Sequence, residues 1–271
     1  MRAIFDKFPN VSRFVLAIVL FALVLFVSGL TNRGVVKEYF PYVSCIFLFI
    51  ATWFLYRTEK KSLKAIGLNF SLRNVSLLPL GILIGIFALF GAKYFRALYL
   101  GETFEFTTTI DYSTILLAFY FILPQVTTEE FLFRGYLFKK TIEVSNVVVA
   151  NIIFSILFML IHVLDEGVMN NRGLLILLVV SIPVGHLLFA TALLKSKSLF
   201  FPIGLHLGNN WATRHLISDA NTSDSILYIT NPNSFETWTS FIVFLIIFNG
   251  FFLLVTFVIW KWDKILVLVK R

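Results

Sequence analysis

The chain has one cysteine, Cys45, among its 271 residues. A single thiol excludes an internal disulfide framework and a multi-thiolate metal site. Charged residues are also scarce, at 14%, whereas soluble domains usually contain roughly 25%. This scarcity excludes an ordinary water-soluble enzyme and a disordered chain. Hydrophobic residues instead make up 58% of the sequence and include 32 phenylalanines, which indicates a polytopic membrane protein.

The apolar residues gather in eight runs, each near the roughly 20 residues with which a helix crosses a bilayer. The runs occupy residues 14–30, 39–56, 77–95, 114–138, 147–164, 174–194, 199–217 and 241–260. The first run is longer than the apolar core of a cleaved signal peptide, so it is interpreted as a retained span. The sequence therefore predicts an all-α bundle of about eight transmembrane helices, forming a single domain over residues 1–271.

Loop charges give the orientation of these predicted spans. If the N-terminus lies in the cytoplasm, the inner segments contain 16 basic and 4 acidic residues, and the outer segments contain 6 basic and 9 acidic residues. The inner side then has a net charge of +12 and the outer side −3. An excess of Lys and Arg in cytoplasmic loops is the usual asymmetry of membrane proteins. Both termini are therefore predicted to lie inside.

The formal net charge of +8 raises the question of an acidic partner. The basic residues are spread over separate loops beside the spans, and they form neither a basic stripe nor a nucleic-acid-binding motif. Lys and Arg at these places are suited to anionic lipids at the cytoplasmic surface. We expect anionic lipids as partners and no nucleic acid.

Three charged residues, Glu129, Glu130 and Arg134, lie inside the fourth predicted span. An ionised residue at the centre of a membrane helix costs about 2.5–3.5 kcal/mol, so these should face the bundle interior or a wet cavity. Glu130 and Arg134 are four residues apart and can pair on one helix face. Glu129 is rotated by about 100° and stays available for another task. The alternative is a packing clamp with Glu129 at the membrane edge.

Two further spans carry residues four positions apart. Phe158 and His162 share a face of the fifth span, and His206 and Asn210 share a face of the seventh. Each pair alone could serve helix packing, and polar side chains often hydrogen-bond between membrane helices. The remaining histidines, at positions 186 and 215, have no such spacing and are interpreted as packing residues.

Together, Glu129, His162, His206 and Asn210 could hydrolyse a carbonyl compound with water. A glutamate or histidine can act as the general base, and histidine and asparagine side chains can donate hydrogen bonds to a developing oxyanion. Glutamate and histidine are also metal ligands. No His-Glu-x-x-His motif of zinc proteases is present, and we predict no metal and no cofactor.

Three motifs in this region resemble those of the CAAX protease and bacteriocin-processing (CPBP) membrane proteins, which include the type II CAAX prenyl endopeptidases. The family motifs are Glu-Glu-x-x-x-Arg, Phe-x-x-x-His and His-x-x-x-Asn. They stand here as Glu129-Glu130…Arg134, Phe158…His162 and His206…Asn210. The resemblance covers residues 112–215, the expected catalytic core.

The resemblance implies an intramembrane endopeptidase that hydrolyses a peptide bond without a covalent intermediate. It assigns Glu129 as the base that activates water and His162 as the residue that positions this water. His206 and Asn210 would form the oxyanion hole.

The resemblance also implies that Glu130 and Arg134 hold the site in shape. The substrate would be a peptide or protein that enters from the membrane, either a prenylated CAAX-like tail or a bacterial peptide or membrane protein.

Short loops favour a bacterial plasma membrane over the endoplasmic reticulum. The alternatives are a non-catalytic scaffold or immunity protein, and a proton-coupled transporter, although no inverted repeat is found.

Overall fold

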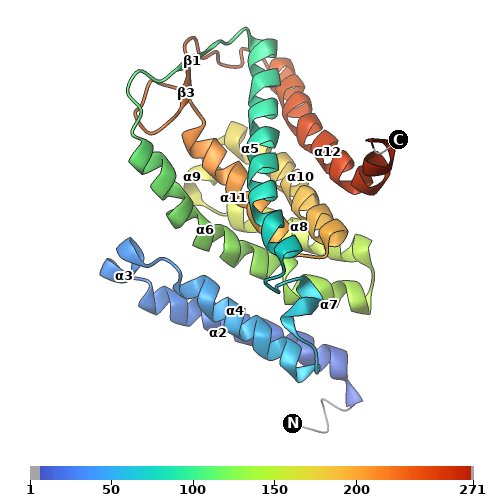
Figure 1. The fold of residues 1–271 in the computed structure, drawn as a ribbon. Helices are drawn as coiled ribbons and strands as arrows, with labels where there is room; N and C mark the ends of the chain where they lie inside the picture. The colour runs from blue at the N-terminus through green and yellow to red at the C-terminus, as the bar shows by residue number, and fades with distance from the viewer. Residues whose placement is uncertain (1–6, 270–271) are drawn as a thin grey trace.

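The computed structural model describes the backbone of residues 7–269 and the side chains of residues 7–264. Figure 1 shows a bundle of helices with three short strands. The helices are α2 (Pro9–Thr31), α3 (Gly34–Tyr39), α4 (Val43–Thr58), η1 (Leu63–Ile66), α5 (Leu72–Leu100), α6 (Tyr112–Arg134), α7 (Tyr136–Val144), α8 (Val147–Val163), α9 (Glu166–Met169), α10 (Arg172–Ser196), α11 (Phe200–His215) and α12 (Trp238–Val269). The prediction of an all-α membrane bundle is confirmed.

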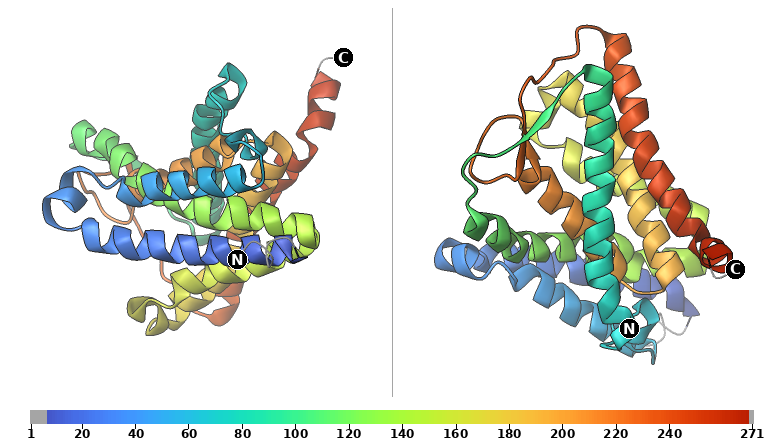
Figure 2. Two further views of the ribbon diagram at one scale, coloured as in Figure 1. Left: turned by 90° about the horizontal axis from the view of Figure 1, so that it is seen from below. Right: turned by 45° about the horizontal axis from the view of Figure 1, so that its top comes forward.

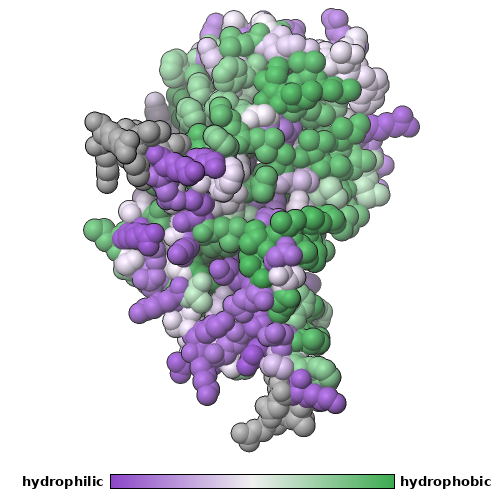
Figure 3. Space-filling model, turned by 90° about the vertical axis from the view of Figure 1, so that its right-hand side faces the viewer, coloured by the Kyte–Doolittle hydropathy of each residue, from purple (hydrophilic) through white to green (hydrophobic). Residues whose placement is uncertain are grey.

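Each of the eight predicted runs forms a helix. Within the described chain, five segments are long and apolar enough to cross a membrane, namely α2, α5, α6 with α7, α10 and α12. The shorter α4 and α8 are apolar, whereas α11 has 16 residues and lies mostly buried in the bundle. Large hydrophobic side chains are exposed on many of the helices, and Figure 3 shows them covering much of one face. Such a surface is suited to lipid.

Helix α11 lies at the centre because it packs on α5 through glycines. Gly81 and Gly85 of α5 face α11, and Gly204 and Gly208 of α11 face α5. A Cβ added at Gly85 would lie 2.1 Å from the Leu205 carbonyl oxygen, so only glycine permits this approach. Small residues bring membrane helices into backbone contact in this way.

The fourth predicted span, 114–138, was too long. Helix α6 ends at Arg134, and the chain turns at Gly135 before α7 begins. A Cβ on Gly135 would lie 2.2 Å from the carbonyl oxygen of Phe131, which explains the glycine at this turn. The third span was predicted too short at its outer end, since α5 continues to Leu100.

Helix α6 is continuous through Pro124. Proline has no N–H, so the carbonyl of Tyr120, four residues earlier, loses its helical partner. The hydroxyl of Tyr42 on α4 donates to that carbonyl oxygen at 2.9 Å. The proline therefore creates an acceptor that ties α6 to the N-terminal pair of helices, α2 and α4, which lie side by side along the bundle (Figure 2).

On one side of the bundle, two loops that were predicted to lie outside join in a small sheet. The strands are β1 (Phe104–Phe106), β2 (Ile217–Ser218) and β3 (Leu227–Ile229), in the order β1-β3-β2. Strand β3 is antiparallel to β1 and parallel to β2. The all-α prediction did not include these strands, because strands this short leave no alternating pattern in the sequence.

Segments that were predicted to lie inside also meet each other. Glu59, just after α4, contacts Lys140 of α7 at 2.9 Å, and Lys61 contacts Glu143 at 3.0 Å. The contacts on both sides agree with the predicted alternation of the loops. Which side faces the cytoplasm stays a prediction from the loop charges.

Candidate active site

Glu130 and Arg134, four residues apart on α6, form a buried ion pair. Both side chains are fully buried, and Arg134 Nη1 donates to Glu130 Oε1 at 3.1 Å. The guanidinium lies 4.1 Å from the ring centroid of Phe158 on α8 and 5.1 Å from that of Phe189 on α10. The pairing expected from the four-residue spacing is present, and aromatic faces supply further attraction for the cation.

His206 of α11 lies between the two adjacent glutamates of α6. Its Nδ1 is 2.8 Å from Glu130 Oε1, and its Nε2 is 3.6 Å from Glu129 Oε2. The ring stacks on Phe189, with centroids 4.5 Å apart and planes 18° apart. The contact between His206 and Glu130 was not predicted, since helix periodicity relates residues only within one helix.

The neighbours of Glu130 determine the His206 tautomer. Glu130 Oε1 accepts from Arg134 and acts as an acceptor here, so His206 Nδ1 donates to it. The hydrogen is inferred from this network. Only Nε2 then remains to face Glu129 and the cavity.

Glu129 is held much more loosely than Glu130. Its Oε1 accepts one hydrogen bond, from Gln125 Nε2 at 3.3 Å. Its Oε2 has no hydrogen-bond partner within the described part of the chain, since His206 at 3.6 Å is too distant. One oxygen atom of this carboxylate is therefore free to accept a proton.

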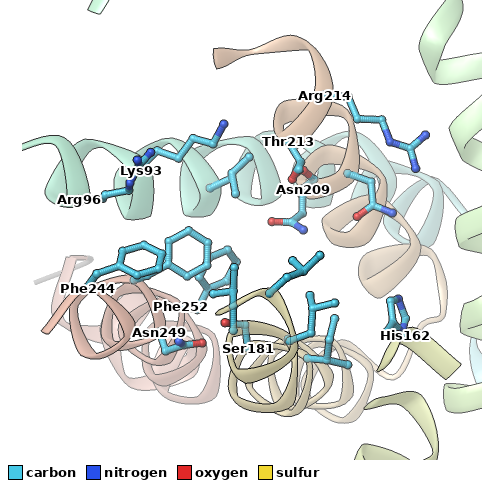
Figure 4. A pocket seen from close by; sticks show the side chains of 18 of the residues that line it. Lys93, Arg96, His162, Ser181, Asn209, Thr213, Arg214, Phe244, Asn249 and Phe252 are labelled. Carbon is cyan, nitrogen blue, oxygen red and sulfur yellow. The ribbon is translucent and has the colours of Figure 1, made fainter. Parts of the chain in front are cut away.

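A cavity of about 810 Å³ adjoins this group. Gln125, His162, His206 and Asn210 line it, so the structure brings residues of the predicted fourth, fifth and seventh spans to one space. Figure 4 shows His162 at one end, polar side chains of α11 along one wall and phenylalanines of α12 along the other. Its walls combine apolar and hydrogen-bonding groups, as is usual for binding sites.

His162 lies on this cavity without touching the glutamates. Its Nδ1 donates to the carbonyl oxygen of Phe158 on its own helix at 2.8 Å, which leaves Nε2 as an acceptor. The rings of Phe158 and His162 are 4.7 Å apart. The Asn210 side chain lines the cavity and makes no hydrogen bond with another described residue, so its amide is available to a ligand.

Cationic side chains lie on the same cavity, at the end opposite to His162 (Figure 4). Lys93 Nζ donates to the Ile217 carbonyl oxygen at 2.7 Å, and Arg96 pairs with Glu102 at 2.9 Å. Sequence analysis treated both as outer-side charges, because the contact between α5 and α11 that brings them to the cavity leaves no local pattern.

The other two histidines lie outside this group. His186 is buried, with its ring centroid 5.9 Å from that of Phe138. His215 Nδ1 donates to the Asp224 carbonyl oxygen at 2.7 Å. Both agree with the interpretation as packing residues. Within the described residues, no cluster of three or more His, Cys, Asp or Glu side chains could hold a metal ion.

Sequence analysis missed Gln125 and Phe189. Gln125 could have been found, because it is the sole glutamine of the chain, lies in a predicted span and precedes Glu129 by four residues. Phe189 left no such signal, since phenylalanine is abundant along the whole sequence.

Comparison with known proteins bears on the region of the three motifs. Residues 111–212 match the model of the family described as "Type II CAAX prenyl endopeptidase Rce1-like". This is nearly the segment 112–215 expected from the motifs, and it confirms the resemblance. No curated protein matches the chain, and no solved structure matches it.

Proposed function

We propose that the chain is a CAAX-type intramembrane protease, which its match to the Rce1-like family model over residues 111–212 supports, and that Glu129 activates the water that hydrolyses the peptide bond. The observation that carries this proposal is the contrast between two adjacent carboxylates. Glu130 is fully buried and paired with Arg134, whereas Glu129 keeps a free oxygen atom beside His206. A general base needs such an unoccupied acceptor within reach of a water molecule.

In the proposed reaction, Glu129 Oε2 takes a proton from water while the water oxygen bonds to the peptide carbonyl carbon. His162 Nε2 accepts a hydrogen bond from the second O–H of that water, which stays bonded to the attacking oxygen, and so orients the water. The negative charge moves to the carbonyl oxygen. When the C–N bond breaks, Glu129 returns its proton to the departing amine nitrogen. No bond to the protein forms at any step.

The oxyanion requires hydrogen-bond donors fixed before the reaction. The Asn210 side chain can supply one from Nδ2. Since His206 Nδ1 already donates to Glu130, its Nε2 can donate only from the doubly protonated ring. Glu130 and Glu129 lie on either side of this ring, at its Nδ1 and Nε2 respectively. Glu130 and Arg134 thus act through His206, as positioning residues.

The substrate we propose is a peptide or protein that reaches the cavity from the membrane. The family name favours a prenylated CAAX-like tail, and a bacterial peptide or membrane protein is the other candidate. The phenylalanines of the α12 wall suit an apolar substrate segment. We further propose a bacterial plasma membrane, anionic lipids at the basic loops and no nucleic-acid partner.

The test is cleavage of a membrane-embedded or prenylated peptide by purified protein, followed by mass spectrometry. Wild type should cleave and Glu129→Gln should not, because an amide cannot accept the proton. If Glu129→Gln keeps wild-type activity, the proposal is wrong. If neither protein cleaves any peptide of either class, while the wild type moves protons across vesicles, the transporter alternative replaces it.

A second experiment addresses metal. The proposed steps use side chains alone, so wild-type activity should persist in chelator, and zinc should not restore Glu129→Gln. A complete loss of activity on chelation that zinc reverses would contradict the glutamate mechanism.

A further inference from the structure

We propose that Gln125 positions Glu129 for its role as base, and that Arg214 sets the orientation of the Gln125 amide. This inference rests on the proposed function. Gln125 lies one turn before Glu129 on α6, and its Nε2 donates to Glu129 Oε1 at 3.3 Å. On its other side, Gln125 Oε1 accepts from Arg214 Nη2 at 3.3 Å. Both Gln125 and Arg214 line the cavity.

An amide suits the place between Glu129 and Arg214, because it has a donor at one atom and an acceptor at the other. An ionised carboxylate only accepts hydrogen bonds, and a guanidinium only donates them. A side chain between the two must donate at one end and accept at the other. If the Gln125 amide flipped, its oxygen would face Glu129 and its NH₂ group would face Arg214, and both contacts would be repulsive. Arg214 therefore selects the orientation that donates to Glu129.

A neutral donor also explains how Glu129 differs from Glu130. Glu130 is paired with the guanidinium of Arg134, a fixed charged partner that Glu129 does not have. Gln125 orients Glu129 without adding a charge. It uses only Oε1, so Oε2 stays free and faces His206.

The contact also crosses between helices. Gln125 belongs to α6 and Arg214 to α11, the helix that carries His206 and Asn210. The two hydrogen bonds from Arg214 through Gln125 to Glu129, called the relay below, thus fix the base relative to the residues proposed to stabilise the oxyanion. Rate depends steeply on such alignment, since small displacements of reacting groups are costly.

The test compares kcat and KM for four variants of the purified protein. Gln125→Met fills the space without hydrogen bonds and should lower kcat about 10-fold, the effect of one lost hydrogen bond to a charged group, with KM unchanged. Arg214→Met should lower kcat less. The double variant should be no slower than Gln125→Met, because Arg214 acts through Gln125. Gln125→Glu should lower kcat most, since it places a second negative charge against Glu129.

Matched measurements keep the result interpretable. Arg73→Met changes an exposed arginine outside the cavity and should leave kcat unchanged. Arg214→Lys keeps a donor and should recover part of the rate. If Gln125→Met lowers the melting temperature in detergent, the exposed Arg214 and its lysine variant carry the test.

Three outcomes would overturn the relay. These are an unchanged kcat in Gln125→Met, additive effects in the double variant, and a rise of KM alone in Arg214→Met, which would make Arg214 a substrate contact. Wild-type cleavage that is absent in Glu129→Gln would still support the proposed function in each case. Failure of the relay is thereby distinguished from failure of the function.

Discussion

Helix α11 presents two different interfaces on its opposite sides. Toward α5 it offers Gly204 and Gly208, and the contact is backbone against backbone. Toward α6 it offers His206, which reaches both Glu129 and Glu130. His206 follows Gly204 by two residues and is turned about 200° away from it. The glycine face fixes the position of α11 against α5. The polar face depends on that position, because it places His206 beside the glutamates of α6.

The difference teaches how a membrane protein stabilises a charged site. Charges in a lipid-surrounded bundle require partners, and partners on other helices require fixed distances between helices. Gly208 approaches Ile82 so closely that a Cβ would lie 2.1 Å from the Ile82 carbonyl oxygen. A contact of this kind leaves little freedom for sliding, so His206 stays at Glu130.

The largest expected loss of stability comes from the polar face. Arg134→Met leaves Glu130 as a buried charge with only His206 beside it, and loss of one partner of a buried pair costs about 3–5 kcal/mol. The melting temperature in detergent should fall markedly. The double variant Glu130→Gln/Arg134→Met removes both charges and should recover part of the loss. An unchanged melting temperature in Arg134→Met would show that the ion pair of Glu130 and Arg134 does not stabilise the fold.

The next effect is on rate. Asn210→Ala removes one proposed donor from the oxyanion site, and a lost donor of this kind typically costs about 10²–10³ in kcat. Stability should not change, since the Asn210 side chain makes no hydrogen bond with the described residues. Residual cleavage should remain above that of Glu129→Gln. Equal activity of Asn210→Ala and wild type would exclude Asn210 from the oxyanion site.

The glycine face should respond by packing alone. Gly208→Ala forces a methyl group against the backbone of α5, and overpacking costs about 1–3 kcal/mol. The displacement of α11 should also slow cleavage. Gly250→Ala is the matched control, because apart from its own stretch of helix nothing lies within 4 Å of its added Cβ. Similar melting temperatures for the two variants would show that the α5–α11 contact is less tight than described.

The smallest effect concerns Glu59, which lies just after the end of α4. Burial alone would raise the pKa of Glu59, but hydrogen bonds from Tyr136, Lys140 and Lys61 outweigh it and lower the pKa to about 2. A lowered pKa contributes stability above the unfolded value of 4.5, which is lost as the pH falls toward 2.

Glu59→Gln tests this contribution. The difference in melting temperature between wild type and Glu59→Gln should be constant from pH 7 to 5 and shrink below about pH 4.5. Glu236→Gln, a change at an exposed loop residue, is measured alongside as the control. A difference that grows on acidification would mean that folding raises the pKa of Glu59 instead of lowering it.

Much of this architecture could be predicted from the sequence. The hydrophobic runs predicted the helices, and the spacing of Glu130 and Arg134 predicted their pair, because both features repeat within one helix. The contact from His206 to Glu130 joins residues 76 positions apart, and no helical period reports on it. The turn at Gly135 was missed because apolar residues continue on both sides of it.

The central claim is that two adjacent glutamates have separate tasks, and parallel measurements on Glu129→Gln and Glu130→Gln test it most directly. Each variant would be assayed for peptide cleavage, peptide binding and melting temperature in the same detergent. The account predicts that Glu129→Gln binds the peptide and melts like wild type but does not cleave, whereas Glu130→Gln is less stable and keeps part of its activity. Cleavage by Glu129→Gln at the wild-type rate, or two variants with identical properties, would contradict it.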